Sequence, residues 1–204
     1  MYQQNYSQFD YFGEFGTVVS ALNADSNIPV KNTLIGPNLA TSWTPEQVWD
    51  TGFVTSYTNN LAYLAVERLV LQTNNLFLPP HFVQPTNNNA YLRYPADNCG
   101  AQFNLGAPID PQTEFPSYLT HQAGQQLCSS YLNSTAYAQS TGKKLLMFET
   151  NTASCGGFPG ISDSFGAALW GLDYSLQMAF SNFSGAMFHV GGQNVYYNVS
   201  VVRL

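Results

Sequence analysis

Charge is what this sequence has least of, and positive charge above all. Charged residues make up 9% of its 204 residues, against roughly a quarter in ordinary globular proteins. Only six residues are Lys or Arg, and the net charge is −6. A chain with no basic surface cannot hold phosphate backbones, so we expect no nucleic acid partner. The 45% of hydrophobic residues is nevertheless enough for one sizeable core.

Long apolar runs are missing as well. None approaches the roughly 18 residues that a membrane span needs, so we expect no membrane partner. The chain does not open on a basic segment followed by an apolar one, so we expect no signal peptide within it. Four glycosylation sequons still give weak support to an extracellular protein; they begin at Asn5, Asn133, Asn182 and Asn198.

Cysteine and cofactor motifs are equally sparse. Cys99, Cys128 and Cys155 are odd in number, so they allow one disulfide with one thiol left over, and the pairing stays open. No Cys-x-x-Cys pair, P-loop, GxGxxG loop, HExxH or EF-hand pattern occurs. We therefore expect no cofactor and no metal site.

What the sequence does contain is a regular alternation of helical and strand-like segments. Thr44-Pro45-Glu46 has the residues of a helix start, namely a capping Thr, Pro at the first helical position and an acid in the first turn. Alternating helices and buried strands indicate an α/β fold with a parallel sheet. The expected helices are residues 11–24, 44–59, 115–140 and 165–180, and the expected strands are residues 32–40, 61–67, 143–151 and 185–192.

One stretch breaks the pattern. Residues 68–93 have neither helical nor strand periodicity and contain Pro79-Pro80 and three consecutive Asn. Proline and this composition oppose helices and central strands, so we expect an irregular loop outside the sheet.

Glu149 is the first candidate for chemistry. It ends an apolar strand and precedes small and polar residues, and in α/β barrels the active site lies at the carboxyl ends of strands. A carboxylate there can attack the anomeric carbon of a sugar if a second carboxyl group protonates the leaving oxygen. The alternative is a strand-end Glu that caps a helix or pairs with a surface charge.

His189 lies at another strand end, before Gly191-Gly192. A lone His beside glycines is often a structural hydrogen-bonding residue. Cys155 with His189 would form a nucleophilic pair, but Cys is commonly a small buried residue and no third, orienting group is evident. Glu67 also ends a strand, where a paired or solvent-facing carboxylate is the simpler interpretation.

The segment FETNTASCGGFPGISDSFGAALWGLDYSLQMAFSNFSGAMFHVGGQNVYY (Phe148 to Tyr197) closely resembles the nucleophile strand, helix and final strand of fungal glycoside hydrolase family 79, the β-glucuronidase type. The segments FDYFGEFG, LIGPNLA, LAYLAVE and YPADNC follow in family order. The resemblance covers most of the chain except its first residues, residues 68–93 and the last six.

The resemblance implies a (β/α)₈ TIM barrel followed by a small β-sandwich, and retaining hydrolysis of β-linked glucuronic acid. It makes Glu149 the nucleophile and Tyr94 its hydrogen-bonding partner. Asn151, His189 and Gly191 fall among positions that line the sugar pocket. The implied partner is a carbohydrate, a glucuronide, and no cofactor is implied.

The departures from the family pattern are specific. The family's acid/base Glu stands in an Asn-Glu-Pro segment after strand four, and no Asn-Glu pair occurs in this chain. We therefore expect a partial barrel, about strands 5–8 with their helices, with the β-sandwich absent. Residues 1–204 would then be a partial catalytic domain with an irregular insert at 68–93 and an aberrant tail at 199–204.

Two consequences follow for the chain by itself. We expect it to be inactive alone, or to be a non-catalytic sugar-binding remnant. Exposed strand edges are templates for pairing with other chains, so we also expect self-association through them. The sequence does not identify the glycan.

Overall fold

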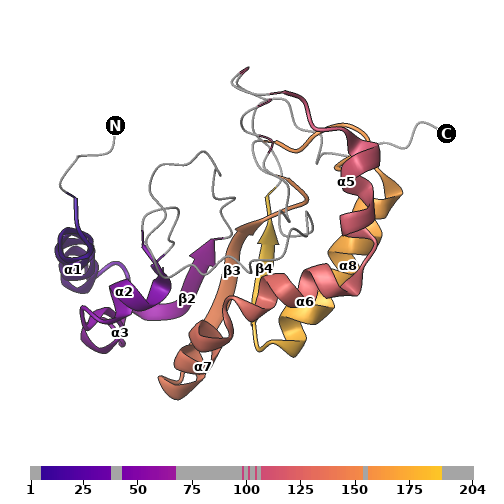
Figure 1. Cartoon of the computed structure of the whole chain (residues 1–204). Helices are drawn as coiled ribbons and strands as arrows, with labels where there is room; N and C mark the ends of the chain where they lie inside the picture. The colour runs from indigo at the N-terminus through magenta and orange to yellow at the C-terminus, as the bar shows by residue number, and fades with distance from the viewer. Residues whose placement is uncertain are drawn as a thin grey trace. The chain divides into compact units, whose positions relative to one another are not determined.

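The structure, a computed structural model, describes residues 6–37, 43–67, 98, 101, 104, 107–153 and 156–189. In that part of the chain one sheet has the strand order β1-β2-β3-β4 (Figure 1). Its strands are β1 (Leu34–Ile35), β2 (Leu61–Glu67), β3 (Lys144–Thr150) and β4 (Gly185–Phe188). The helices are α1 (Gln8–Ala24), α2 (Pro45–Trp49), α3 (Phe53–Ser56), α5 (Pro111–Tyr118), α6 (His121–Ser129), α7 (Leu132–Ser140) and α8 (Phe165–Phe180).

The strands are parallel and neighbour one another in chain order. β1 pairs with β2, and β2 with β3, in parallel register. The Ser184 N–H donates to Leu145 O and the His189 N–H donates to Thr150 O, both at 2.8 Å. The two bonds advance in the same direction along both strands, from Leu145 to Thr150 on one side and from Ser184 to His189 on the other. β4 therefore runs parallel to β3. The chain therefore has the α/β fold with a parallel sheet that the alternating pattern predicts.

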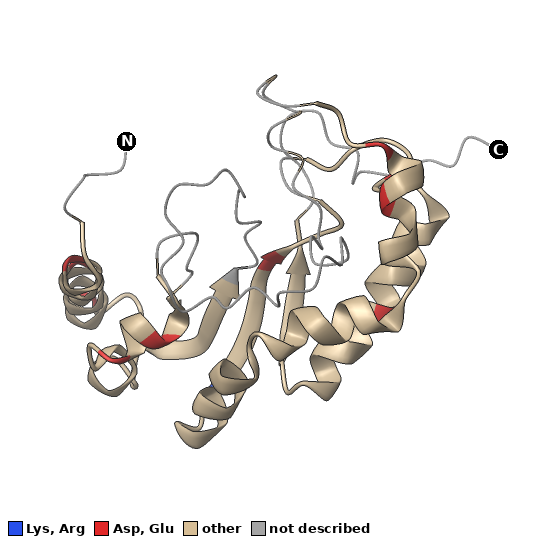
Figure 2. Ribbon diagram, viewed as in Figure 1, with Lys and Arg blue, Asp and Glu red and all other residues tan. Residues whose placement is uncertain are grey.

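The chain divides into two compact units. Unit 1 comprises Met1–Arg68, Cys128–Glu149 and Met178–Met187, and unit 2 comprises Leu69–Leu127, Thr150–Gln177 and Phe188–Leu204. Charged positions are thinly spread along the described ribbon (Figure 2). No helix in the described ranges is long and apolar enough to cross a membrane.

An aromatic cluster holds unit 1 together on its α1 side. Phe15 packs edge-on against Phe53 at 4.6 Å between ring centroids, and Tyr57 packs against Phe12 and Phe15 at 5.0 and 5.2 Å. The Tyr57 hydroxyl donates to Phe12 O at 2.7 Å. A Cβ at Gly16 would lie 2.6 Å from that hydroxyl oxygen, so α1 reaches Tyr57 only because this position has no side chain.

The predicted helix over residues 44–59 is wrong in its length. Its start is confirmed, with Pro45 as the first helical residue. The Gln47 N–H donates to the Thr44 hydroxyl, and the Thr44 N–H donates to the Gln47 side-chain oxygen. The chain then forms two short helices, α2 and α3, instead of one. Gly52 between them has φ +83°, a left-handed conformation that interrupts a right-handed helix.

The predicted helix over residues 115–140 is likewise three helices. α5 begins earlier, after Asp110, whose side chain accepts from Gln112 N–H. Leu119 N–H bonds to Pro116 O and Tyr131 N–H to Cys128 O. These three-residue hydrogen bonds are tighter than the four-residue α-helical ones and end α5 and α6. Residue periodicity does not reveal such a tightening.

The other strand and helix predictions hold, with changes at some ends. β2 matches residues 61–67 and α8 matches 165–180, β3 lies within 143–151, and α1 begins at Gln8 rather than at residue 11. β4 ends at Phe188, and β1 is only Leu34–Ile35, with residues 38–40 outside the described part. The insert 68–93 and the tail 199–204 also lie outside it.

Candidate active site at the end of strand β3

Glu149 is the last residue but one of β3, and its side chain is half-buried. Val66 on β2 pairs with Met147 on β3, but the next pair is Glu67 with Glu149, so Phe148 has no partner on β2. Such an extra residue is a β-bulge, and bulges commonly occur next to active sites, where they re-aim a side chain. Glu67, the last residue of β2, is therefore the register partner of Glu149.

Burial along β3 agrees with the bulge. Leu145 and Met147 are buried and Leu146 is not, as strand alternation requires. Phe148 and Glu149 are both half-buried, and burial resumes at Thr150. Unbroken alternation would bury Glu149 with Leu145 and Met147, so its partial exposure agrees with a shift of register at Phe148.

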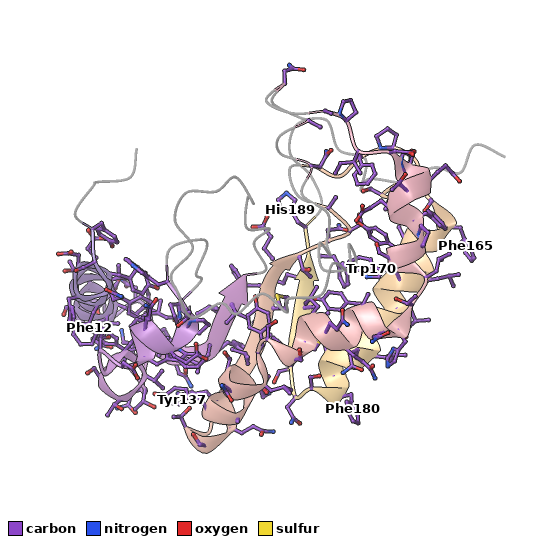
Figure 3. The ribbon with its side chains drawn as sticks, viewed as in Figure 1. Phe12, Tyr137, Phe165, Trp170, Phe180 and His189 are labelled. Carbon is purple, nitrogen blue, oxygen red and sulfur yellow. The ribbon has the colours of Figure 1, made fainter. Side chains whose placement is uncertain are left out.

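Asn151 and His189 are brought together within unit 2. The His189 backbone N–H donates to Thr150 O, and its carbonyl accepts from Asn151 Nδ2 at 2.7 Å. Asn151 Oδ1 accepts from Thr152 N–H, also at 2.7 Å. Both ends of the Asn151 amide are therefore engaged with backbone. The His189 side chain is exposed just past the end of β4 (Figure 3).

The loop after β3 is held by a buried hydroxyl network that sequence reasoning missed. Thr152 Oγ1 donates to Ser162 Oγ at 2.8 Å, and Phe158 N–H donates to the same oxygen at 3.1 Å. The Tyr118 hydroxyl donates to Thr152 O, and Asn98 Nδ2 donates to Gly157 O at 2.6 Å. In the sequence Ser162 reads only as a residue before a helix, so nothing marked it as the centre of this network.

Of the remaining candidate residues, the structure describes only Cys128. Tyr94, Gly191, Cys99 and Cys155 lie outside the described residues. Cys128 is described, buried and free, and burial raises the pKa of its thiol to about 11. A thiol with that pKa is almost wholly protonated at neutral pH, so Cys128 is no nucleophile.

Most acidic side chains in the described ranges have structural tasks. Several cap helices or turns, and the hydrogen bonds from Ser7 and Thr113 lower the pKa values of Asp10 and Asp110. The pairs are Asp10 with Ser7, Glu14 with Tyr6, Asp25 with Asn27, Glu46 with Ser134, Asp110 with Gln112 and Thr113, Asp163 with Gly160 and Asp173 with His121. No group of three His, Cys, Asp or Glu in the described ranges could hold a metal ion.

Comparisons with known proteins point to glucuronidases. No family model matches the chain. Over 51 residues, 25% of this chain and 9% of the relative, it is 43% identical to a curated β-glucuronidase of Aspergillus niger. Its structure is similar to a 4-O-α-L-rhamnosyl-β-D-glucuronidase from Fusarium oxysporum, solved as a Rha-GlcA complex, with a TM-score of 0.63, 17% identity, and coverage of 94% of this chain and 33% of that one.

The chain thus spans a third or less of the length of the proteins that it matches. The structural match shows the fold alone. The sequence match, which is short, supports a glucuronidase-like family.

Proposed function

We propose that this chain is the nucleophile-bearing part of a retaining β-glycosidase of glycoside hydrolase family 79 that acts on glucuronides, with Glu149 as nucleophile. The observation that carries the proposal is the position of Glu149 at the carboxyl end of a parallel strand, half-buried beside a bulge. The relatives that share the fold or a stretch of sequence are glucuronidases.

The reaction needs two carboxyl groups. A Glu149 oxygen attacks the anomeric carbon as the bond to the leaving oxygen breaks, which forms a glycosyl ester. The second carboxyl group protonates the leaving oxygen and then deprotonates the water that hydrolyses the ester. In retaining enzymes the two groups lie about 5–5.5 Å apart.

The second carboxyl group is the missing part. No Asn-Glu pair occurs in the sequence, and most other described acids have structural partners. Glu67 is the register partner of Glu149, but it comes from the neighbouring strand rather than from the family's strand four. We therefore propose that this chain alone lacks its acid/base, which is typically worth about 10²–10⁴-fold in rate.

Of the four residues expected to contact the sugar, only Asn151 is given a different role. Tyr94, His189 and Gly191 are proposed to line the glucuronide pocket. Because both ends of the Asn151 amide bond to backbone, Asn151 acts by fixing the chain after β3 against the end of β4. The proposed architecture is strands 5–8 of a (β/α)₈ barrel in an extracellular enzyme, with residues 68–93 as an insert and 199–204 as an aberrant tail.

The test is covalent labelling. A dinitrophenyl glucuronide has a good leaving group that needs little protonation, so the chain should form a glycosyl ester at Glu149 that intact-mass spectrometry detects. Glu149→Gln should abolish the mass increase. Glu14→Gln is the control, because Glu14 bonds to Tyr6 on the exposed side of α1, and it should label like the wild type. Labelling at any other residue refutes the role of Glu149.

Two further measurements test the missing acid/base. Azide is an anion that attacks without a general base, so it should speed the breakdown of the ester and release a β-glycosyl azide. A natural glucuronide-containing oligosaccharide, whose leaving group needs protonation, should not be turned over. Efficient turnover of that oligosaccharide by the chain alone would show that it contains a working acid/base.

A second candidate is a protein that binds a uronic acid without cleaving it, which the missing second carboxyl group favours. Calorimetry with glucuronic acid distinguishes the two. Binding without labelling by the dinitrophenyl substrate supports this candidate, whereas labelling at Glu149 supports the glycosidase. An acyl-transfer reaction at Cys155 would instead show an esterase activity that iodoacetamide abolishes.

A further inference from the structure

Helix α8 has an apolar stripe on its exposed side. Five large side chains on it, at intervals of three and four residues, are between 52% and 84% exposed: Phe165, Leu169, Leu172, Leu176 and Phe180. These intervals place all five on one helical face. The opposite side holds buried Trp170, whose ring packs edge-on against Phe188 at 5.9 Å. Figure 3 shows Phe165 and Phe180 near the two ends of the helix.

The stripe carries no charge. Helical geometry places Ala168, Ser175 and Ala179 along one side of it, and both alanines are exposed. The charged residue of α8 is Asp173, at the other side of the stripe, and it pairs with His121 at 2.9 Å. Small residues on one side let another helix approach closely, to the 8–10 Å between axes that packed helices adopt.

The exposed area is large for a surface that meets only water. With about 200 Å² for a large apolar side chain, five at these exposures present roughly 700 Å². Contiguous apolar patches above a few hundred Å² mark interaction sites. A stable interface between two proteins buries about 800 Å² on each partner. The stripe with its neighbouring alanines therefore has about the area that one partner contributes.

We propose that a second copy of this chain covers this stripe, with α8 of one copy packed against α8 of the other about a two-fold axis. A two-fold interface brings the same patch from both copies together. An uncharged face suits this because it buries no pair of like charges. The surface is the outer face of a helix and is distinct from the strand edges through which we expected self-association.

Sedimentation velocity tests the proposal. The wild-type chain should be a dimer at about 100 µM and dissociate on dilution. Leu172→Glu, in the middle of the stripe, should raise the dimer dissociation constant at least about a hundredfold, since it places two carboxylates in an apolar contact. Leu132→Glu is the matched control: Leu132 on α7 is 50% exposed, outside the stripe, and this variant should stay dimeric.

A second variant gives an independent readout. Leu172→Cys should form a disulfide between two copies on mild oxidation, because residues near a two-fold axis face their own equivalents, and Leu132→Cys should not. Far-UV circular dichroism should be unchanged in every variant, since both leucines are at least half exposed. A wild-type monomer at the highest concentration overturns the proposal, and so does association that persists in Leu172→Glu.

Discussion

Ser162 offers a sharp test of what holds the chain after Glu149. Its hydroxyl oxygen accepts from Thr152 Oγ1 and from the Phe158 N–H, and all three residues are buried. Ser162→Ala leaves two buried donors without a partner. An unpaired buried group costs about 1–3 kcal/mol. At about 1–2 kcal/mol for each of these two neutral donors, the free energy of opening this loop should fall by roughly 2–4 kcal/mol.

A double-mutant cycle separates this network from a simple loss of packing. Thr152→Val removes one donor, so Ser162→Ala in that background leaves only the Phe158 N–H without a partner. Ser162→Ala should therefore destabilise the Thr152→Val variant less than it destabilises the wild type. The difference should be at least about 1 kcal/mol, which lies within the coupling range of contacting residues. Ser175→Ala is the control: its hydroxyl donates within α8 to Gly171 O, and it should change stability little.

Hydrogen exchange of the amides in residues 150–164 measures the effect locally. A loss of 2–4 kcal/mol corresponds to exchange faster by roughly 30- to 1000-fold. If the two substitutions prove additive, or if Ser162→Ala exchanges like Ser175→Ala, the hydroxyl network does not hold this loop.

Three other predictions concern unit 1. Iodoacetamide should alkylate Cys128 roughly a hundredfold more slowly in the native chain than in urea at pH 8, because burial raises the thiol pKa from 9.0 to about 11; equal rates would contradict this. The capping serine lowers the pKa of Asp10, so the stability from Asp10 is present above its unfolded value of about 3.9 and is lost as pH falls through the lower folded pKa. Asp10→Asn should therefore flatten the pH dependence of the melting temperature below about pH 4, and an unchanged slope would contradict this. Gly16→Ala should destabilise by about 1–3 kcal/mol in thermal melts, because its Cβ would lie 2.6 Å from the Tyr57 hydroxyl; Gly13→Ala, whose Cβ meets nothing within 4 Å, should stabilise α1 by about 0.5–1 kcal/mol, and a similar effect at both sites would refute the packing argument.

Local chemistry in the sequence predicts some element boundaries and misses others. Thr44-Pro45 starts α2 as expected, but α1 begins at Gln8 rather than at residue 11 and α5 at Pro111 rather than at residue 115. The breaks after Trp49 and after Tyr118 were missed. Gly52 was available as a signal for the first, but a glycine inside a helical pattern is often tolerated. The tight turn that ends α5 leaves no mark in the periodicity.

The candidate site was predictable as a position but not as an arrangement. A Glu at the end of an apolar strand predicts a position at the carboxyl edge of a parallel sheet, where α/β barrels have their active sites, and Glu149 lies at that edge. The bulge was not predictable, because KLLMFET has four consecutive apolar residues and no alternation from which a slipped register could be seen. The hydroxyl network depends on residues ten positions apart that meet only after the loop folds.

The scarcity of charge has a consequence for the segment between β3 and α8. In its described part, Thr152, Ser162 and Asn151 hold the chain through amide and hydroxyl groups, and the carboxylate of Asp163 adds one bond from the Gly160 N–H at 2.6 Å. Hydroxyl and amide side chains do not titrate near neutral pH. The bonds made by Thr152, Ser162 and Asn151 should therefore hold the segment equally well on both sides of neutrality, and hydrogen exchange of the Thr152 and Phe158 amides, corrected for intrinsic rates, should show the same protection at pH 6 and pH 8.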